Sequence, residues 1–571
     1  MHPIKLSAIA VTLGAMLLYP PARAAESAVQ TATMILTNAR VYTVNPQQPW
    51  AESVAIKDDE IVYVGDSASA LNWAGHGTEI LDLQGQMLLP GFHDSHLHLL
   101  YGGEAIRSCD LSEAYSAQSV RNTLLACGEA PGRGEDNWII ASVWNRTSFA
   151  GGEPPAGFLD ELFPDIPVAV SASDGHSLWV NTRAMRIAGI DKNTLNPPNG
   201  IIFRDPVTAK PTGVLSGSAM QMLAASIPLP SLQENMQSIQ GAIRMAHSLG
   251  ITAAIEPGLN IEQAKAFHAL AEHNALGMRL QLCLAPIGWE VDQFGLEVFD
   301  FLEQAPVAAS PLLAQNCVKL FMDGALEANT AAMLEPYLGD SQPFPACYEL
   351  DELVPILRGL DERRVSAHVH AIGDAATRLA LDGFAAIRPP EGFNARPVIT
   401  HLQFVTAADI PRFGALGVAA SITPYWMYQD ELTLQIYPQL VGLEKSLGAY
   451  PVKAIADSGG RLLGSSDWSV SSMDPLLGIE TAVTRQDPLS DNGNPLGESQ
   501  KLDLATMIAA YTIDVAWAMG RDQETGSIEV GKKADLVVLD KNLFDLSPYD
   551  ISNARVTRTL FGGETVWPMQ D

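Results

Sequence analysis

The sequence predicts an α/β protein. We expect a (β/α)8 TIM-like barrel, a composite β-sandwich formed by both chain ends, and a large insertion after the first barrel strand. Three observations support this fold class. Short β-branched runs broken by Asn, Asp and Gly occur near both ends of the chain. Eight apolar runs lie between them, and from the second run onward stretches of helical periodicity separate them. About 150 residues separate the first two of these runs.

The first 24 residues predict a cleaved signal peptide. Lys5 supplies a positive charge, residues 6–19 form an apolar stretch, and residues 22–24, Ala-Arg-Ala, resemble a cleavage site. The alternative is a buried N-terminal helix, which the small residues after a double proline disfavour. We therefore expect an exported protein, periplasmic or secreted. No later run reaches the roughly 18 apolar residues of a membrane span.

The sandwich is expected from residues 25–89 and 522–571. The first segment holds "MILTNARVYTVNP" and "AESVAIKDDEIVYVGD", and the second holds "GSIEVGKKADLVVLD". These are short strand patterns with turn residues between them. Similar strand-rich segments at opposite ends of a chain predict one small sheet domain, with a separate domain between them.

The barrel is expected from residues 90–521, with an inserted subdomain at about 103–235 that includes "PVAVSASDGHSLWVN". Helical patterns such as "IEQAKAFHALAEHNALG" separate the later runs. The eight apolar runs are "MLLPGFHDSHLH", "GITAAIEPG", "RLQLCLAP", "CVKLFMDG", "RVSAHVHAIGD", "PVITHLQF", "GVAASITP" and "RLLGSSD".

Charge and cysteine content narrow the possible partners. The chain has 65 acidic and 35 basic residues, a net charge of -30, which disfavours nucleic acid and anionic membranes. A small-molecule substrate remains, and a homo-oligomer stays open. No CxxC is present, so a thiolate zinc site is disfavoured. Cys109 and Cys127 could pair or stay free, and Cys283 and Cys317 are expected in the core.

The densest cluster of chemical groups is "PGFHDSHLH", residues 90–98. On a strand, His96 and His98 would point to the same side and could reach one metal ion. A hydrogen-bonded pair of histidines is the alternative. His93 is out of phase with the other two, so we expect a packing or supporting role for it.

Lys319 is unusual because it lies inside an apolar barrel strand, where a charged amine carries a high desolvation cost. Carboxylation by carbon dioxide would turn it into an anionic bridge between two metal ions. The alternative is a salt bridge to a nearby acid such as Asp323.

Further polar residues end later strands, at the face where barrel active sites form. His370 lies near the end of the fifth run, His401 ends the sixth and Asp467 ends the eighth. His368 lies deeper and is expected in the core or behind the site. Asp467 could bind a metal and transfer a proton, or could only cap a helix.

Taken together, these residues resemble the amidohydrolase superfamily, and more closely its YtcJ-like group (amidohydrolase family 3), which includes N-substituted formamide deformylase. The resemblance covers essentially the whole mature chain. It rests on the motifs "FHDSHLH", "DGHSLWVN", "VKLFMDG", "VHAIGD", "THLQF" and "GSSDW" followed by "DPLLGIETAVTR".

The resemblance implies a role for each residue. His96 and His98 would hold a first metal, and a second metal would be held by His370 and His401. A carboxylated Lys319 would bridge the two metals. Asp467 would be a metal ligand and the acid/base.

His176, in "DGHS", would polarise the substrate carbonyl or lie near the metals, or make only a structural contact. Imidazole and carboxylate ligands favour zinc as the divalent metal, with one or two ions.

The predicted activity is therefore metal-dependent hydrolysis of a C–N bond in an amide, formamide or imide. The same site could serve an esterase, lactonase or phosphotriesterase, and a non-catalytic regulatory binding protein is a further alternative. Two segments need separate comment. "MDGALEANT" departs from the group's usual pattern, and "PYWMYQD" could line a pocket for an apolar substrate or pack as a lid.

Overall fold

The computed structural model describes most of the chain, and the predicted signal peptide, residues 1–24, lies outside the described part. No helix in the described part is both long and apolar enough to cross a membrane. The described residues are 31–569 except 108, 130–137, 151, 174, 225, 228–229, 287–293, 307–309 and 491–492.

The two chain ends form a β-sandwich of two sheets. One sheet has the strand order β5-β4-β1-β6, and the other has the order β24-β23-β22-β7-β2-β3. The ends meet where β7 pairs antiparallel with β22, with Leu88 opposite Val538. Side chains from both ends, such as Leu36 and Leu560, share one core. The strands are β1 (Met34–Thr37), β2 (Arg40–Tyr42), β3 (Trp50–Ala51), β4 (Ser53–Lys57), β5 (Glu60–Gly65), β6 (Glu79–Asp82), β7 (Met87–Pro90), β22 (Leu536–Leu539), β23 (Val556–Phe561) and β24 (Glu564–Trp567).

The central domain is an eight-stranded parallel barrel with the order β21-β20-β19-β18-β17-β16-β15-β8. Its strands are buried along most of their length, as parallel strands with covered faces must be. Directly after the first strand, the Ser95 amide donates to the carbonyl of Gly464, the last residue of the last strand, at 2.9 Å and brings these two strands together. The strands are β8 (Phe92–Asp94), β15 (Ile251–Leu259), β16 (Arg279–Leu284), β17 (Leu313–Phe321), β18 (Ser366–Ala371), β19 (Val398–His401), β20 (Ala419–Ile422) and β21 (Leu462–Gly464).

Helices cover the outside of the barrel, and their ends carry the expected signals. In α8 (Ile261–Glu272), Asn260 and Gln263 form a capping box that satisfies the first amides. The same motif starts α7 (Leu232–Ser248). The other helices around the barrel are α9 (Glu297–Gln304), α10 (Leu350–Glu362), α11 (Asp374–Ile387), α12 (Ile410–Leu416), α13 (Tyr437–Val441), α14 (Leu443–Leu447), α15 (Val452–Asp457), α16 (Pro475–Thr484), α17 (Leu504–Ala510) and α18 (Ile513–Ala518).

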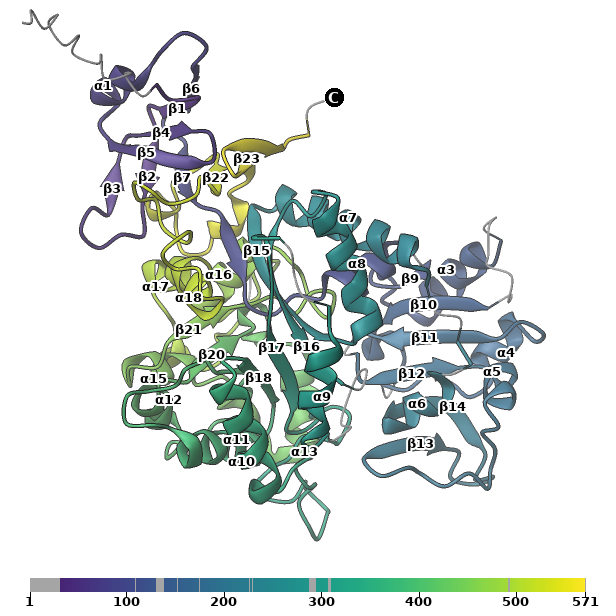
Figure 1. Ribbon diagram of the computed structural model, residues 1–571. Coiled ribbons are helices and arrows are strands. Elements are labelled where there is room, and N and C mark those ends of the chain that lie inside the picture. The colour runs from purple at the N-terminus through teal and green to yellow at the C-terminus, as the bar shows by residue number, and fades with distance from the viewer. Residues whose placement is uncertain are drawn as a thin grey trace, which may run out of the picture.

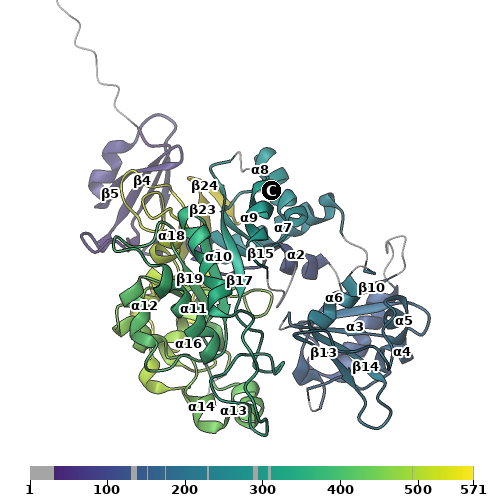
Figure 2. The same ribbon diagram turned by 60° about the horizontal axis from the view of Figure 1, so that its bottom comes forward.

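The long segment after β8 forms a separate sheet with the order β13-β14-β12-β11-β10-β9 and apolar cores of its own. It lies at the opposite end of the molecule from the sandwich (Figures 1 and 2). Helix α2 (Leu99–Arg107) leads into it. Its other elements are β9 (Cys109–Asp110), α3 (Ala117–Glu129), β10 (Ile139–Trp144), α4 (Phe158–Leu162), β11 (Val168–Ala172), β12 (Ser177–Val180), α5 (Thr182–Ile187), β13 (Gly200–Arg204), β14 (Pro211–Gly217) and α6 (Gln221–Ala224).

The first apolar run, residues 87–98, is shared between two domains. It divides at Gly91, so that β7 belongs to the sandwich and only Phe92–Asp94 continues as barrel strand β8. A Cβ at Gly91 would lie 2.3 Å from the Thr252 hydroxyl, so this position is too crowded for a side chain. His96 and His98 therefore lie on the loop after β8 and not on a strand.

The pairing of the cysteines also differs in part from the prediction. Cys109 and Cys127 form a disulfide within the inserted subdomain. Cys283 and Cys317 are buried as expected, but they are joined to each other across β16 and β17 rather than being separate core thiols. The pairing follows from the register, because these two residues stand opposite each other in the sheet. Cys347 is buried.

Candidate metal centre

The seven predicted site residues line one cavity at the carboxyl end of the barrel strands. The cavity measures about 30 Å³, which is room for an ion and little more. Residues far apart in the sequence meet here because parallel strands end at the same face. His96 and Lys319, for example, are 223 positions apart. The lining consists of His96, His98, His176, Gly258, Lys319, Phe321, His370, His401, Asp467 and Val470.

Asp467 stands at the centre of this group. Its Oδ1 lies 3.1 Å from His98 Nε2 and 3.5 Å from His96 Nε2. Its Oδ2 lies 3.6 Å from His401 Nδ1. One donor atom from each of His96, His98 and Asp467 lies within 4.8 Å of the other two. Two imidazole nitrogens and a carboxylate oxygen at this spacing can hold one divalent ion.

Two buried donor atoms without hydrogen bonds in the described part of the chain give a second reason to expect a metal here. His401 Nδ1 and Asp467 Oδ1 are buried and make no hydrogen bond with any residue that the structure describes. A buried polar atom without a partner costs roughly 1–3 kcal/mol, so it needs an explanation. An ion coordinated by these atoms would remove that cost.

Three of the imidazoles, those of His96, His370 and His401, are held in the neutral form that a metal requires. Burial, followed by the charge of Lys319, keeps the pKa values of His96 and His370 well below the usual range. Burial, followed by the neighbouring His370, does the same for the pKa of His401. A neutral ring leaves one nitrogen lone pair available for coordination.

Lys319, on β17, is 2% exposed and its Nζ lies 3.3 Å from His96 Nε2. Burial lowers the pKa of its amine to about 7, so a large fraction is uncharged at neutral pH. An uncharged amine is the form that reacts with carbon dioxide. The predicted alternative, a salt bridge to Asp323, is not formed in the described part of the chain.

Asp323 instead supports the neighbouring ligand loop. Its carboxylate accepts backbone hydrogen bonds from Ile372 at 3.0 Å, from Gly373 at 2.8 Å and from Ala332 at 2.9 Å. Its Oδ1 also lies 3.6 Å from His370 Nε2. These contacts anchor the end of β18, which carries His370.

His370 and His401 form the other side of the cavity, with ring centroids 4.5 Å apart. His370 Nε2 lies 3.0 Å from the Gly324 carbonyl, to which it donates. The proton is then on Nε2, so Nδ1 carries the lone pair. His401 stacks on Trp426 with ring centroids 5.6 Å apart and planes 7° apart, so the aromatic segment after β20 contacts the site directly.

His176 reaches the cavity from the inserted subdomain. It lies in the turn between β11 and β12, and its ring centroid is 5.6 Å from that of His370. It is partly exposed, unlike the buried histidines of the barrel. The insertion thus contributes one side chain to a site otherwise built by the barrel.

Three features of the site were not predicted by sequence patterns. Asp94 accepts hydrogen bonds from the amides of His96 at 2.9 Å and Ser466 at 3.1 Å, which ties the two loops that carry His96 and Asp467. His401 and Asp467 have positive φ angles, 75° and 52°. Such left-handed conformations are uncommon outside glycine and concentrate at functional sites. The third feature is the contact of His368 with His96: the sequence predicted the deeper position of His368 but not this partner.

Comparison with known proteins gives a consistent result. The model of a family described as the amidohydrolase family matches residues 79–567. The chain is 29% identical over 554 residues to the Arabidopsis thaliana protein LONG AFTER FAR-RED 3, covering 94% of this chain and 92% of that one. It is 28% identical to Bacillus subtilis YtcJ, covering 92% and 98%.

Two further proteins are similar over nearly their whole length. N-substituted formamide deformylase from Arthrobacter pascens is 23% identical, covering 94% of this chain and 98% of that one. The crystal structure of an uncharacterized metal-dependent hydrolase from Pyrococcus horikoshii OT3 has a TM-score of 0.70 at 25% identity, covering 90% of this chain and 99% of that one. The barrel and the sandwich thus belong to one known architecture.

Proposed function

Because the chain belongs to the amidohydrolase family, and is therefore a hydrolase, we propose that it hydrolyses a C–N bond in a small amide, formamide or imide. The observation that carries this proposal is the position of Asp467, whose carboxylate oxygens lie 3.1–3.6 Å from nitrogens of three buried histidines. The similarity to N-substituted formamide deformylase supports the C–N bond as the target.

A divalent metal bound here would polarise the scissile carbonyl and lower the pKa of the attacking water. His96, His98, His370, His401 and Asp467 would hold it. Their imidazole and carboxylate donors favour zinc, in one or two copies. With two ions, a carboxylated Lys319 would supply the bridging oxygens.

The chain's own groups then move the proton. Asp467 accepts a proton from the attacking water through a carboxylate oxygen and passes it to the departing nitrogen. We assign to His176 the hydrogen bond that is donated to the carbonyl oxygen, because its imidazole is partly exposed whereas the other described histidines that line the cavity are buried. His96, His370 and His401 stay neutral, since burial opposes their charged form.

A substrate panel tests the proposal. Metal-loaded enzyme is offered N-acyl amines, N-substituted formamides, cyclic imides and aryl esters, each with the metal-stripped enzyme as its control. We expect turnover of at least one C–N substrate that disappears when the metal is removed. Turnover of esters, lactones or phosphotriesters alone would favour the second candidate chemistry, and metal binding without any turnover would favour a regulatory binding protein.

We also propose that the protein is exported and acts in the periplasm or outside the cell. The charged, apolar and small-residue regions of residues 1–24 support export, and so do the two disulfides, because disulfides persist in oxidising compartments. N-terminal sequencing of the protein from the periplasm or medium should start near Ala25. Cytoplasmic protein that still begins at Met1 would contradict export.

A further inference from the structure

We propose that His368 is a positioning residue that holds His96 in the tautomer and orientation needed to bind metal. The inference rests on the proposed function, because it assigns a partner to one of the proposed ligands. His368 does not line the cavity and lies behind it, on β18. It is 1% exposed.

The contact between the two rings is specific. His368 Nε2 lies 2.8 Å from His96 Nδ1, and the ring centroids are 4.9 Å apart. The opposite nitrogen of His96, Nε2, faces the centre, 3.5 Å from Asp467 Oδ1. The His96 ring therefore spans from the back wall to the metal-facing side.

This geometry fixes where each proton must be. A metal takes the lone pair of His96 Nε2, so the proton of His96 must be on Nδ1. That N–H donates to His368 Nε2, which must then be the unprotonated nitrogen of its own ring. A hydrogen bond of this kind on the far side of a ligand fixes its tautomer and ring angle.

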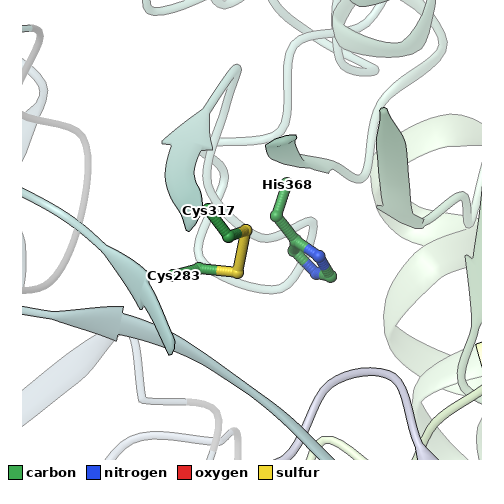
Figure 3. A group of neighbouring side chains, drawn as sticks. All are labelled: Cys283, Cys317 and His368. Carbon is green, nitrogen blue, oxygen red and sulfur yellow. A yellow bond between two sulfur atoms is a disulfide. The ribbon is translucent and has the colours of Figure 1, made fainter. Parts of the chain in front are cut away.

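The surroundings of His368 leave it few other partners. Figure 3 shows its ring beside the Cys283–Cys317 disulfide, and one of its ring nitrogens lies within 4.8 Å of both sulfur atoms. Sulfurs bonded to each other are at most weak acceptors and offer no thiolate for a metal. Among the described residues, His368 Nδ1 has no hydrogen-bond partner. The strong hydrogen bond of this ring is thus the one to His96.

Two nearly isosteric replacements separate hydrogen bonding from packing. Gln can place its amide oxygen near the position of the imidazole Nε2, whereas Met has the same length and no strong acceptor. The full mature chain is stripped of metal, and its affinity for Zn²⁺ is measured by competition with a chromophoric chelator. His368→Met should weaken zinc binding by roughly 10–100-fold, the usual effect of losing such a partner. His368→Gln should restore most of that loss.

The control is the same pair of replacements at His247, a buried histidine on α7 whose Nε2 contacts the Gly277 carbonyl away from the cavity. These variants should bind zinc like the wild type. If His368→Met does not fold, His368→Asn takes its place, because its shorter amide does not reach His96.

Zinc affinity within twofold of the wild type in the Met or Asn variant would overturn the inference, and so would a Gln variant as weak as the Met variant. Because the readout is metal affinity, a wild type that binds zinc but hydrolyses nothing would remove the proposed function and leave this inference standing.

Discussion

The molecule contains two His-x-His pairs, and they are used differently. In the first pair, His96 and His98, both rings line the cavity. In the second pair, His368 and His370, only His370 lines it, and His368 lies behind. The local sequence spacing is the same in both, so the difference comes from the path of the backbone.

The second pair lies on β18, where residues two apart point to the same side but are separated by about 6–7 Å along the strand. One ring is then at the rim and the other is a layer deeper. The first pair lies on a loop that has left the strand direction, so both rings can reach one point. The same motif gives two ligands on a loop, and one ligand with its support on a strand.

The loop that carries His96 and His98 lies outside the sheet ladders and is held by hydrogen bonds to other segments. The His98 amide donates to the Trp468 carbonyl at 2.9 Å, and the Asp467 amide donates to the His96 carbonyl at 2.8 Å. Asp94 and Glu256 add side-chain acceptors for neighbouring amides. The strand pair is instead held by the regular ladders of β17 and β19.

Asp467→Asn should lower turnover by roughly 10²–10⁴-fold, the usual scale for a lost general acid or base. Asn is nearly isosteric and keeps one oxygen toward the loop pair, so the fold and much of the metal should remain. Turnover and metal content are measured on the same preparations. His96→Ala, the companion variant, should lose metal as well as rate. Near-normal turnover in Asp467→Asn would remove this residue from the mechanism and make His176 the next to test.

Lys319→Ala should lower the metal content, because the proposed lysine bridge between two metal ions would be lost. Bicarbonate in the growth medium should raise the activity of the wild type, since it supplies the carbon dioxide that the neutral amine takes up. The control is Lys532→Ala, a buried lysine that donates to the Asp522 carbonyl at 2.6 Å outside the cavity. An unchanged metal stoichiometry in Lys319→Ala would indicate a site without a lysine bridge.

Asp94→Asn should weaken zinc binding by roughly tenfold, at the low end for a lost supporting contact. Both carboxylate oxygens accept from the Ser466 amide, so an Asn must turn its NH₂ toward a donor. Asp361→Asn is the matched control, because Asp361 also accepts two backbone amides but lies away from the cavity. Equal zinc affinities in both variants would show that the loop pair does not depend on Asp94.

Glu256→Gln should change the pH dependence of stability. Burial raises the pKa of Glu256 to about 8, above that of an exposed carboxyl, so the folded protein binds this proton more tightly than the unfolded chain. Its contribution is therefore present at low pH and is lost as the pH rises through about 8. The Gln variant, which cannot ionise, should lose that part of the decline.

The readout for Glu256→Gln is the melting temperature at about pH 5.5 and about pH 8.5, on either side of most of this titration. The gap between the two values should narrow in the variant by a few degrees at most. Identical gaps in wild type and variant would mean that this carboxyl does not titrate in that range.

Much of this architecture was predictable from the sequence. The barrel and sandwich follow from apolar periodicity, and the family resemblance drawn from "FHDSHLH" and "GSSDW" is confirmed by the family match. The roles of His176 and Lys319 stay predictions, although the structure brings both to the cavity.

The features that the sequence could not show depend on the path of the backbone. A strand pattern predicted that His96 and His98 extend from a strand, but the barrel strand ends at Asp94. The positive φ angles of His401 and Asp467 have no compositional signal, because neither residue is glycine. Cys283 and Cys317 lie in apolar runs like any core residues, and only the register of β16 and β17 places them opposite each other.

Metal content and turnover, measured together on the wild type, show whether hydrolysis depends on a bound metal. The mature chain is assayed for bound divalent metal and for hydrolysis of an N-substituted formamide before chelation, after chelation and after zinc is returned. We predict at least one ion per chain, with metal and turnover lost together and restored together. A purified chain that binds no divalent metal, or whose turnover survives complete metal removal, would contradict the account.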